Sequence, residues 1–412
     1  MTLISNSNYT SIAFRIGTSL CKNALWNNNS CNWLEADFNY SRKEYFYHPM
    51  VYNFYEGNCG VAFFLTNLFG STNETVFKTT AIAALNQSFF QSQNDNGIWS
   101  PSFYFGKSGL AYVMLHAAHK FNDNELYQKA ETLTKQITEY DYTKAPLDLT
   151  HGAAGLIPFL IYASAFTKNK KLIDEAVKRA DHLIANAITT NNTMCWNYLN
   201  EHNIPFIGFA HGASGMAYAF AMLYKVTGKQ KYKQVCDNAF NYEDTFFNTN
   251  ENNWRSLDEF NNSDWKKETH LMFQSKWCYG AAGMGLARIA AFQATGNINF
   301  KKMAQHACLA AINSKKDISN FSLCHGHFSN AEFLLTAART FNDNVYMNQA
   351  IKLADYGIHF SDNNNRDWPS GLMGSVPLWS FMNGMAGIGN FYLRIENDAF
   401  IPSGLVLEEL LK

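Results

Sequence analysis

A glycine pair that recurs along the whole chain constrains the fold more than any other feature of the sequence. The pair has the form Gly-x-x-Gly and leads each time into an apolar run. Its seven copies begin at Gly57, Gly106, Gly152, Gly212, Gly280, Gly326 and Gly384. The copy at Gly326 has Ser329 in place of the second glycine. Self-similarity on this scale is typical of proteins built from stacked supersecondary units.

Each copy is followed by a polar break and then by an amphipathic segment. After one of these breaks, Leu126, Ala130, Leu133 and Ile137 recur at helical spacing. The Asn, Asp and Thr residues at the breaks are natural N-caps for that second helix. The pattern predicts one helical hairpin per copy, in which the first helix is buried on most sides and the second lies on the surface.

Seven stacked hairpins can form an open solenoid or a closed ring. We expect the ring, an all-α fold described as an α/α toroid of seven helical-hairpin repeats. An open solenoid needs polar capping repeats, whereas the last copy is among the most apolar and the chain stops soon after it. We expect a single domain over residues 1–412, with an insertion at about 244–274, for which an ordinary long loop is the alternative. The segment before Gly57 is expected to hold an outer helix and a flanking loop.

Composition agrees with a large globular core and excludes some partners. Hydrophobic residues make up 47% and charged residues 16% of the chain, and the formal net charge is -1. Without an excess of basic residues, nucleic acid is not an expected partner. The first residues lack the pattern of a secretion signal, and no long apolar stretch predicts a transmembrane segment. We therefore expect a cytoplasmic protein, in which the eight cysteines serve as free thiols or metal ligands.

The residues just before each glycine pair are expected to line one cavity. At these sharp turns into a helix, we expect the first glycine to permit a positive φ and a close backbone approach. The two residues before the first glycines are Tyr55-Glu56, Tyr104-Phe105, Thr150-His151, Ala210-His211, Cys278-Tyr279, Cys324-His325 and Met382-Asn383. These fourteen places hold three of the twelve histidines and two of the eight cysteines. Reactive side chains are therefore concentrated there.

Cys278, Cys324 and His325 form the candidate metal site. The two cysteines hold the same place in consecutive repeats, and His325 follows Cys324. Two thiolates and an imidazole suit Zn²⁺, and three protein ligands leave an open position of the catalytic type. A closed structural zinc site would need a fourth ligand, for which His270, His327 and His211 are the candidates. Packed cysteines and a core histidine are the alternative without a metal.

The sequences around these residues resemble a known family. The segments WCYGAAG from Trp277, SLCHG from Ser322, GFAHGASG from Gly208 and DLTHGAAG from Asp148 look like signatures of lanthionine synthetase C-like peptide cyclases. The resemblance implies an α/α toroid in which a Cys, Cys, His zinc site activates cysteine thiols of a precursor peptide. The bound thiolate would add to dehydroalanine or dehydrobutyrine, which yields lanthionine or methyllanthionine rings in a lantibiotic-type precursor.

The resemblance also implies catalytic roles. Conjugate addition leaves an enolate that must be protonated, and His211 is the expected acid, with Asp148 to orient or polarise it. A hydrogen-bonded core histidine is the alternative for His211. His151 matches no role that carries over. Cyclases of the family commonly have an arginine four residues before the first zinc cysteine, where this chain has Gln274. Lys276 is the candidate to supply the positive charge instead.

The expected partners follow from the same resemblance. The substrate would be a dehydrated precursor peptide with leader and core, and a dehydratase and an exporter would join the protein in a synthetase complex. Such a complex would bring the cytoplasmic chain to the periphery of the membrane. Two alternatives remain: a relative that adds glutathione to dehydroamino acids, and a non-catalytic zinc-stabilised scaffold of a synthetase complex, which Gln274 suggests.

Overall fold

The computed structural model describes residues 8–39, 41–197, 205–256, 272–314, 320–364, 367–371, 376–396 and 401–410. The chain divides into two compact units. The first unit comprises Met1–Tyr140, Ser319–Glu332 and Asn348–Leu405. The second comprises Asp141–Ile318, Phe333–Met347 and Val406–Lys412. Neither unit is continuous in sequence, and the prediction of a single domain stays a prediction.

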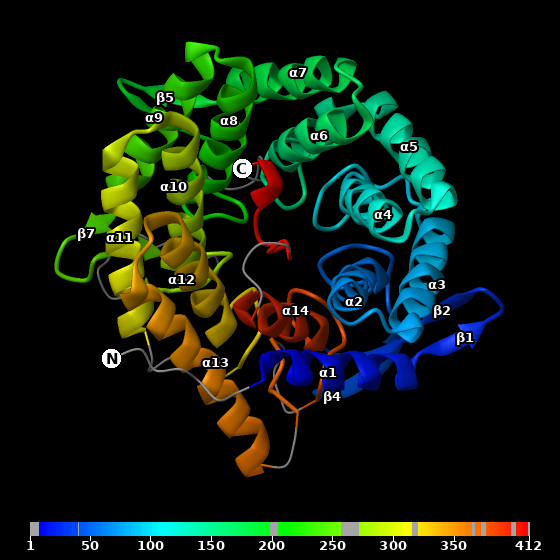
Figure 1. Cartoon of the computed structure of the whole chain (residues 1–412). Coiled ribbons are helices and arrows are strands. Elements are labelled where there is room, and N and C mark those ends of the chain that lie inside the picture. Colours follow the sequence, from blue (N-terminus) through cyan, green and yellow to red (C-terminus); the bar gives the residue numbers. More distant parts are fainter. Residues whose placement is uncertain are drawn as a thin grey trace. The chain divides into compact units, whose positions relative to one another are not determined.

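The first unit contains two helical hairpins and the helices that flank them. Its helices are α1 (Tyr9–Asn23), α2 (Asn58–Thr72), α3 (Thr75–Ser92), α4 (Lys107–Phe121), α5 (Asn124–Glu139) and α14 (Met385–Glu396). Helix α2 packs on α3 and α4 on α5, while α1 lies against α14 and α2 (Figure 1). Two helices, α12 (His327–Phe341) and α13 (Asn344–Asn364), are each divided between the two units.

The second unit contains three hairpins of the same kind. Its helices are α6 (Ala153–Thr167), α7 (Lys171–Ala185), α8 (Ala213–Thr227), α9 (Gln230–Asp244), α10 (Ala281–Thr295) and α11 (Ile298–Asn313). The described residues of this unit also form two short 3-10 helices, η1 (Tyr142–Lys144) and η3 (Glu408–Leu410). Within this unit α8 packs on both α6 and α10, so consecutive repeats are neighbours (Figure 1).

The predicted hairpin pattern is confirmed for the five copies from Gly57 to Gly280, whereas no α-helix follows α14 in the described residues and α1 packs against it instead. The helices α2, α4, α6, α8, α10, α12 and α14 each begin directly after the first glycine of a copy, and we call them the glycine-led helices. In α6 every residue from 153 to 164 is buried, whereas α5 buries Leu126, Ala130, Leu133, Thr134 and Ile137 along one side. Among the described helices, none has the length and apolar character needed to cross a membrane.

The glycines are required for close packing more than for a positive φ. Gly152 has φ -131° and lies in the extended region, so the expected positive φ is wrong there; Gly280, with φ +152°, does have one. At both positions an added Cβ would lie well inside 3.0 Å of a backbone oxygen, that of Pro146 or of Gln274. A side chain at these turns would therefore displace the backbone that the turn folds against.

Short antiparallel strands connect the helices. In the first unit β1 (Leu25–Asn27) pairs with β2 (Ser30–Asn32), and β3 (Leu34–Asn39) with β4 (Glu44–Pro49). The expected outer helix before Gly57 is α1, but the expected flanking loop is wrong, because the antiparallel pairs β1–β2 and β3–β4 lie there. Strand β4 lacks a regular alternation of apolar and polar residues, but its aromatic residues favour an extended backbone.

The second unit has two further small sheets. There β5 (Ile188–Thr190) pairs with β6 (Thr193–Cys195), and β8 (Asn253–Ser256) lies between β7 (Phe247–Asn248) and β9 (Met272–Phe273). The strands β7, β8 and β9 fall within the predicted insertion at 244–274. Residues 257–271 of that stretch lie outside the described residues, so the insertion stays a prediction.

Candidate active site

Backbone hydrogen bonds join the loops that precede the glycine-led helices, which we call the entry loops. In each loop these hydrogen bonds involve the same position, the residue two before the first glycine. In the second unit the N–H of Thr150 donates to the carbonyl of Ala210 at 3.3 Å, and the N–H of Ala210 donates to the carbonyl of Cys278 at 3.1 Å. Consecutive repeats thus present equivalent residues side by side.

The first unit repeats this ladder with other side chains. The N–H of Tyr55 donates to the carbonyl of Tyr104 at 2.9 Å, and the carbonyl of Tyr55 accepts the N–H of Met382 at 3.0 Å. The carbonyl of Met382 in turn accepts the N–H of Cys324 at 3.0 Å. The predicted clustering of the residues before the glycines is therefore seen within each unit.

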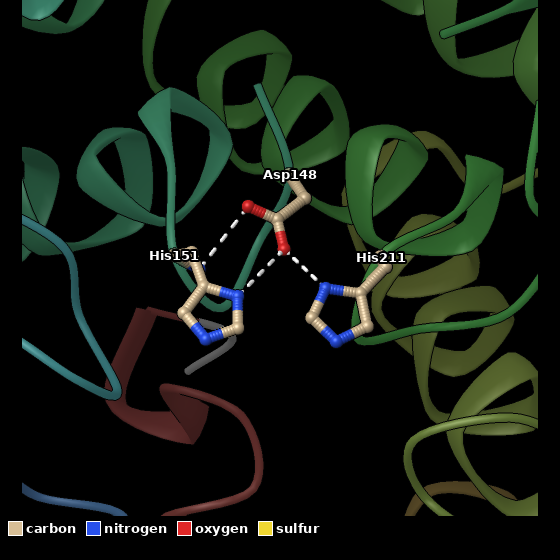
Figure 2. A group of neighbouring side chains, drawn as sticks. All are labelled: Asp148, His151 and His211. Atoms are coloured by element: carbon tan, nitrogen blue, oxygen red, sulfur yellow. Dashed lines mark hydrogen bonds and ion pairs between the residues drawn. The ribbon is translucent and has the colours of Figure 1, made fainter. Parts of the chain in front are cut away.

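Asp148 and His211 meet in the second unit. Asp148 lies in the entry loop of α6 and is completely buried, while His211 lies in the entry loop of α8 and is 15% exposed. Nδ1 of His211 donates a short hydrogen bond to Oδ2 of Asp148. Figure 2 shows the other ring nitrogen of His211 turned away from the carboxylate. The two residues expected to act together are in contact, although they are far apart in sequence.

His151 is a second histidine on the same carboxylate. Its backbone N–H donates to Oδ1 of Asp148 at 3.1 Å, and its Nδ1 lies 3.5 Å from Oδ2 (Figure 2). The rings of His151 and His211 stack with centroids 5.1 Å apart and planes inclined by 9°. Thr150 also donates to Oδ2 of Asp148, at 2.9 Å. Asp148 thus holds both imidazoles in fixed positions.

The surroundings keep Asp148 ionised. Burial by itself raises the pKa of a carboxyl group, but hydrogen bonds from His151 and His211 and attraction to both rings outweigh it. The pKa of Asp148 is lowered from 3.8 to about 2. One negative charge therefore faces the two rings at neutral pH.

The same three side chains also form a donor set for a metal. The ligand atoms of Asp148, His151 and His211 all lie within 4.8 Å of one another, the one such group among the residues that the structure describes. The geometry favours proton transfer. Nδ1 of His211 and Oδ2 of Asp148 are in hydrogen-bond contact, whereas ligands about 2 Å from a shared metal ion would be held apart by it.

A buried ion pair fixes the entry loop that carries His211. Both oxygens of Glu243 are engaged: Oε1 accepts the N–H of Gly208 at 2.8 Å, and Oε2 accepts the hydroxyl of Ser214. Arg288 lies 2.7 Å from Oε2, and the side chains of Glu243 and Arg288 are completely buried. Gly208 has φ +104°, which glycine adopts without strain. The loop is thus held at both ends.

Cys324 and His325 lie in the first unit. Cys324 is buried and accepts a hydrogen bond from the hydroxyl of Tyr55, with 2.9 Å between O and Sγ. Nε2 of His325 lies 2.7 Å from the carbonyl oxygen of Gly371, to which it donates. With the proton on Nε2, the lone pair of the neutral ring is on Nδ1, the form of histidine that binds metals.

Cys278, Lys276 and Gln274 lie in the second unit, in the entry loop of α10. Cys278 is half-buried and its thiol is not in a disulfide. The Tyr279 ring lies 5.6 Å from that of His211. Lys276 is half-buried, and within the described part of the chain no hydrogen bond or ion pair joins its ammonium to another side chain. The proposed roles of Lys276 and of the three metal ligands stay predictions.

Comparison with known proteins places the chain in a family. The sequence profile described as Lanthionine synthetase C-like protein matches residues 48–405. The chain belongs to this family. The matched range contains all seven glycine pairs and every predicted site residue, so the resemblance inferred from the sequence is confirmed.

Two proteins of Lactococcus lactis subsp. lactis are among the relatives of this lanthionine synthetase C-like protein. Lacticin 481/lactococcin biosynthesis protein LcnDR2 is 24% identical over 261 residues, which are 58% of this chain and 24% of that protein. The chain thus spans about a quarter of the length of LcnDR2. Nisin biosynthesis protein NisC is 21% identical over 323 residues, 69% of this chain and 74% of NisC.

A solved structure shares the fold. Nisin cyclase superimposes with a TM-score of 0.68 at 15% identity, over 87% of this chain and 93% of that chain. At this identity the likeness concerns the fold alone. Together with the helical content of the described residues, it confirms the predicted fold class of this lanthionine synthetase C-like protein.

Several residues that build the site were missed from sequence. Thr150 and Tyr55 stand among the fourteen places before the glycines, so their positions were available, but nothing indicated which neighbours their hydroxyls would meet. Glu243 is the next-to-last residue of a surface helix, and Arg288 lies in an apolar helix. A buried arginine in α10 was the available signal, because such a charge needs a carboxylate partner.

Proposed function

We propose that this protein is a peptide cyclase that adds cysteine thiols of a dehydrated precursor peptide to dehydroalanine or dehydrobutyrine, forming lanthionine and methyllanthionine rings. Membership of the lanthionine synthetase C-like family supports this, as do relatives named for nisin and lacticin biosynthesis. The observation that carries the proposal is the hydrogen bond between His211 and the buried, ionised Asp148. This hydrogen bond would make His211 a proton donor within the entry loops, where the reactive residues are concentrated.

The reaction is an isomerisation of the peptide. The thiolate sulfur forms a bond to the β-carbon, the C=C bond is lost, and its electron pair moves to the neighbouring carbonyl as an enolate. The α-carbon then takes one proton, which replaces the one that left the thiol. No oxidant and no leaving group are involved, so the catalyst has to handle two protons and one transient negative charge.

His211 is the proposed acid. As an imidazolium it would donate one N–H to Asp148 and offer the other, which is turned away from the carboxylate, to the enolate carbon (Figure 2). The charge of Asp148 stabilises this protonated form and fixes the ring. Lys276 is proposed to balance the enolate oxygen, in place of the arginine that the family has where this chain has Gln274.

We further propose that Cys278, Cys324 and His325 hold a zinc ion, and the residues fit that role. Two thiols and one imidazole form a zinc donor set, and the hydrogen bond from His325 to Gly371 is the outer support that metal-binding histidines usually have. Cys278 and Cys324 hold the same place in consecutive repeats, the place at which backbone hydrogen bonds join neighbouring entry loops within each unit. Bound zinc would keep an incoming thiol in its thiolate form near neutral pH.

The proposed activity defines the partners. Because the substrate must contain dehydroamino acids, a dehydratase has to act first on serine and threonine of the precursor. We propose a cytoplasmic location, in which the cyclase works with that dehydratase and with an exporter. Gln274 points to the scaffold alternative, and both it and the glutathione-adding alternative become outcomes of the experiment.

The experiment uses the full zinc-loaded chain and a synthetic peptide with one dehydroalanine and one cysteine. Cyclisation leaves the peptide mass unchanged but removes the thiol, so alkylation followed by mass spectrometry counts the uncyclised fraction. We expect thiol loss well above the rate without protein. A thiol that persists while elemental analysis finds zinc bound would contradict the cyclase and favour a scaffold. Glutathione adducts formed when both thiols compete would instead favour the glutathione-adding relative.

A further inference from the structure

The hydroxyl of Tyr55 donates a hydrogen bond to the sulfur of Cys324, with 2.9 Å between oxygen and sulfur. A neutral thiol is a weak acceptor, whereas a metal-bound thiolate carries negative charge and accepts strongly. The contact is therefore arranged for the charged form of Cys324. The two residues are 269 positions apart, so the fold, and not the local sequence, makes this contact.

The phenol of Tyr55 is held from two sides. Its ring stacks on that of Phe105, with centroids 4.7 Å apart and planes inclined by 22°. Its backbone is tied to that of Cys324 through Met382, whose N–H donates to Tyr55 and whose carbonyl accepts from Cys324, each at 3.0 Å. The same backbone hydrogen bonds thus fix the residue that donates and the residue that carries the sulfur, and they keep the hydrogen bond in place.

We propose that Tyr55 is a positioning residue of the zinc centre: its hydroxyl hydrogen-bonds the Cys324 thiolate and withdraws negative charge from that ligand. This inference rests on the proposed zinc site. Once a substrate thiolate joined Cys278 and Cys324, three anionic sulfurs would surround one divalent ion, and each would weaken the ion's pull on the others. A fixed donor on Cys324 leaves more of the metal's charge for the incoming thiol. It also orients the sulfur, as partners of metal ligands generally do.

The chain offers a matched control. Tyr104 holds the place of Tyr55 in the next repeat, but its hydroxyl donates to the carbonyl of Leu405 at 2.9 Å. Tyr55→Phe and Tyr104→Phe each remove one phenolic oxygen and leave the ring. The two variants therefore separate the loss of a hydroxyl at this place from the loss of the bond to Cys324.

The test replaces zinc with Co²⁺ in the full chain and records the sulfur-to-cobalt charge-transfer band. A hydrogen bond lowers the energy of the sulfur electrons, so Tyr55→Phe should shift the band to longer wavelength. Competition with a chromophoric chelator should show zinc affinity weakened about 10–100-fold, the usual range for loss of a partner of a metal ligand. Tyr104→Phe should leave both readouts at the wild-type value.

The two proposals fail in different ways. If Tyr55→Phe matches the wild type in band position and in zinc affinity, Tyr55 has no role at the metal, and the zinc site stands. If the wild-type chain gives no sulfur-to-cobalt band at all, the zinc site itself is wrong, and the inference about Tyr55 falls with it.

Discussion

His211 and His325 stand at the same place in two repeats, yet their rings meet different partners. His211, in the second unit, gives its Nδ1 hydrogen to a buried carboxylate, whereas His325, in the first unit, gives its Nε2 hydrogen to the carbonyl of Gly371. A carboxylate stabilises a protonated ring, and a carbonyl fixes the tautomer of a neutral one. One backbone position thus supplies the proposed proton donor in one unit and a proposed metal ligand in the other.

Loss of the metal is the largest effect expected from this comparison. Cys324→Ala and His325→Ala should each reduce bound zinc from about one ion per chain to nearly none, because three ligands are the minimum of a catalytic zinc site. Elemental analysis of the purified variants measures this. Cys308→Ala, which alters a buried thiol of α11 outside the entry loops, should keep the zinc. If His325→Ala retains about one zinc ion per chain, His325 is not a metal ligand, and the contrast with His211 is wrong.

Loss of turnover with the metal retained should be the next largest effect. His211→Asn removes the proposed proton donor and should lower the rate of ring formation about 10²–10⁴-fold, the usual contribution of general acid catalysis. Zinc content should not change. The control is His306→Asn, since His306 lies in α11, hydrogen-bonds Asn252 and belongs to no entry loop. Zinc loss in His211→Asn would make that histidine a ligand and would remove the contrast with His325.

The two regions also differ in how a buried glutamate holds an entry loop. Glu243 binds the loop of α8 and is paired with Arg288. Glu35 accepts the N–H groups of Trp379 and Ser380, both at 3.0 Å, ahead of α14. Burial raises the pKa of Glu35 from 4.5 to about 7, against the lowering effect of those hydrogen bonds and with the help of the nearby charge of Glu56. One loop is fixed by an ion pair, the other by a carboxyl group that is partly protonated at neutral pH.

Arg288→Met tests the ion pair. It leaves Glu243 completely buried without that cation and should lower the free energy of unfolding by about 3–5 kcal/mol, as measured by urea denaturation at pH 7. Lys231→Met removes a pair with Asp181 in which both side chains are about half exposed, and it should cost at most about 1 kcal/mol. Equal effects of the two substitutions would show that the buried pair does not hold the loop.

Glu35→Gln should have a smaller, pH-dependent effect. Because the folded pKa lies above the unfolded value, the stabilising contribution of Glu35 is complete below about pH 4.5 and is lost as the pH rises through 7. Glutamine does not titrate, so the variant should gain about 1–3 kcal/mol relative to the wild type between pH 5 and pH 8. Thermal unfolding at both pH values measures this, with the exposed Glu44→Gln as control. A difference that does not change with pH would contradict the raised pKa.

Local signals in the sequence predicted the start of each glycine-led helix and the buried side of α5, because both depend on spacing within a few residues. The contact between Asp148 and His211 was expected from family resemblance, and the structure brings the two together. The bond from Tyr55 to Cys324 and the pair of Glu243 with Arg288 could not be predicted, since each depends on which repeats become neighbours. Gly152 shows a further limit. The sequence indicates that no Cβ fits there, but it does not tell whether a positive φ or close backbone packing is the reason.

The backbone ladder between the entry loops has a consequence for how such a protein can change. Its hydrogen bonds use only main-chain N–H and C=O groups, so any residue except proline can stand at the place without breaking it. Tyrosine, threonine, alanine, cysteine and methionine all occupy it in this chain. The same backbone can therefore carry different reactive side chains at this position. One side chain can be exchanged for another without a change in the helices that follow.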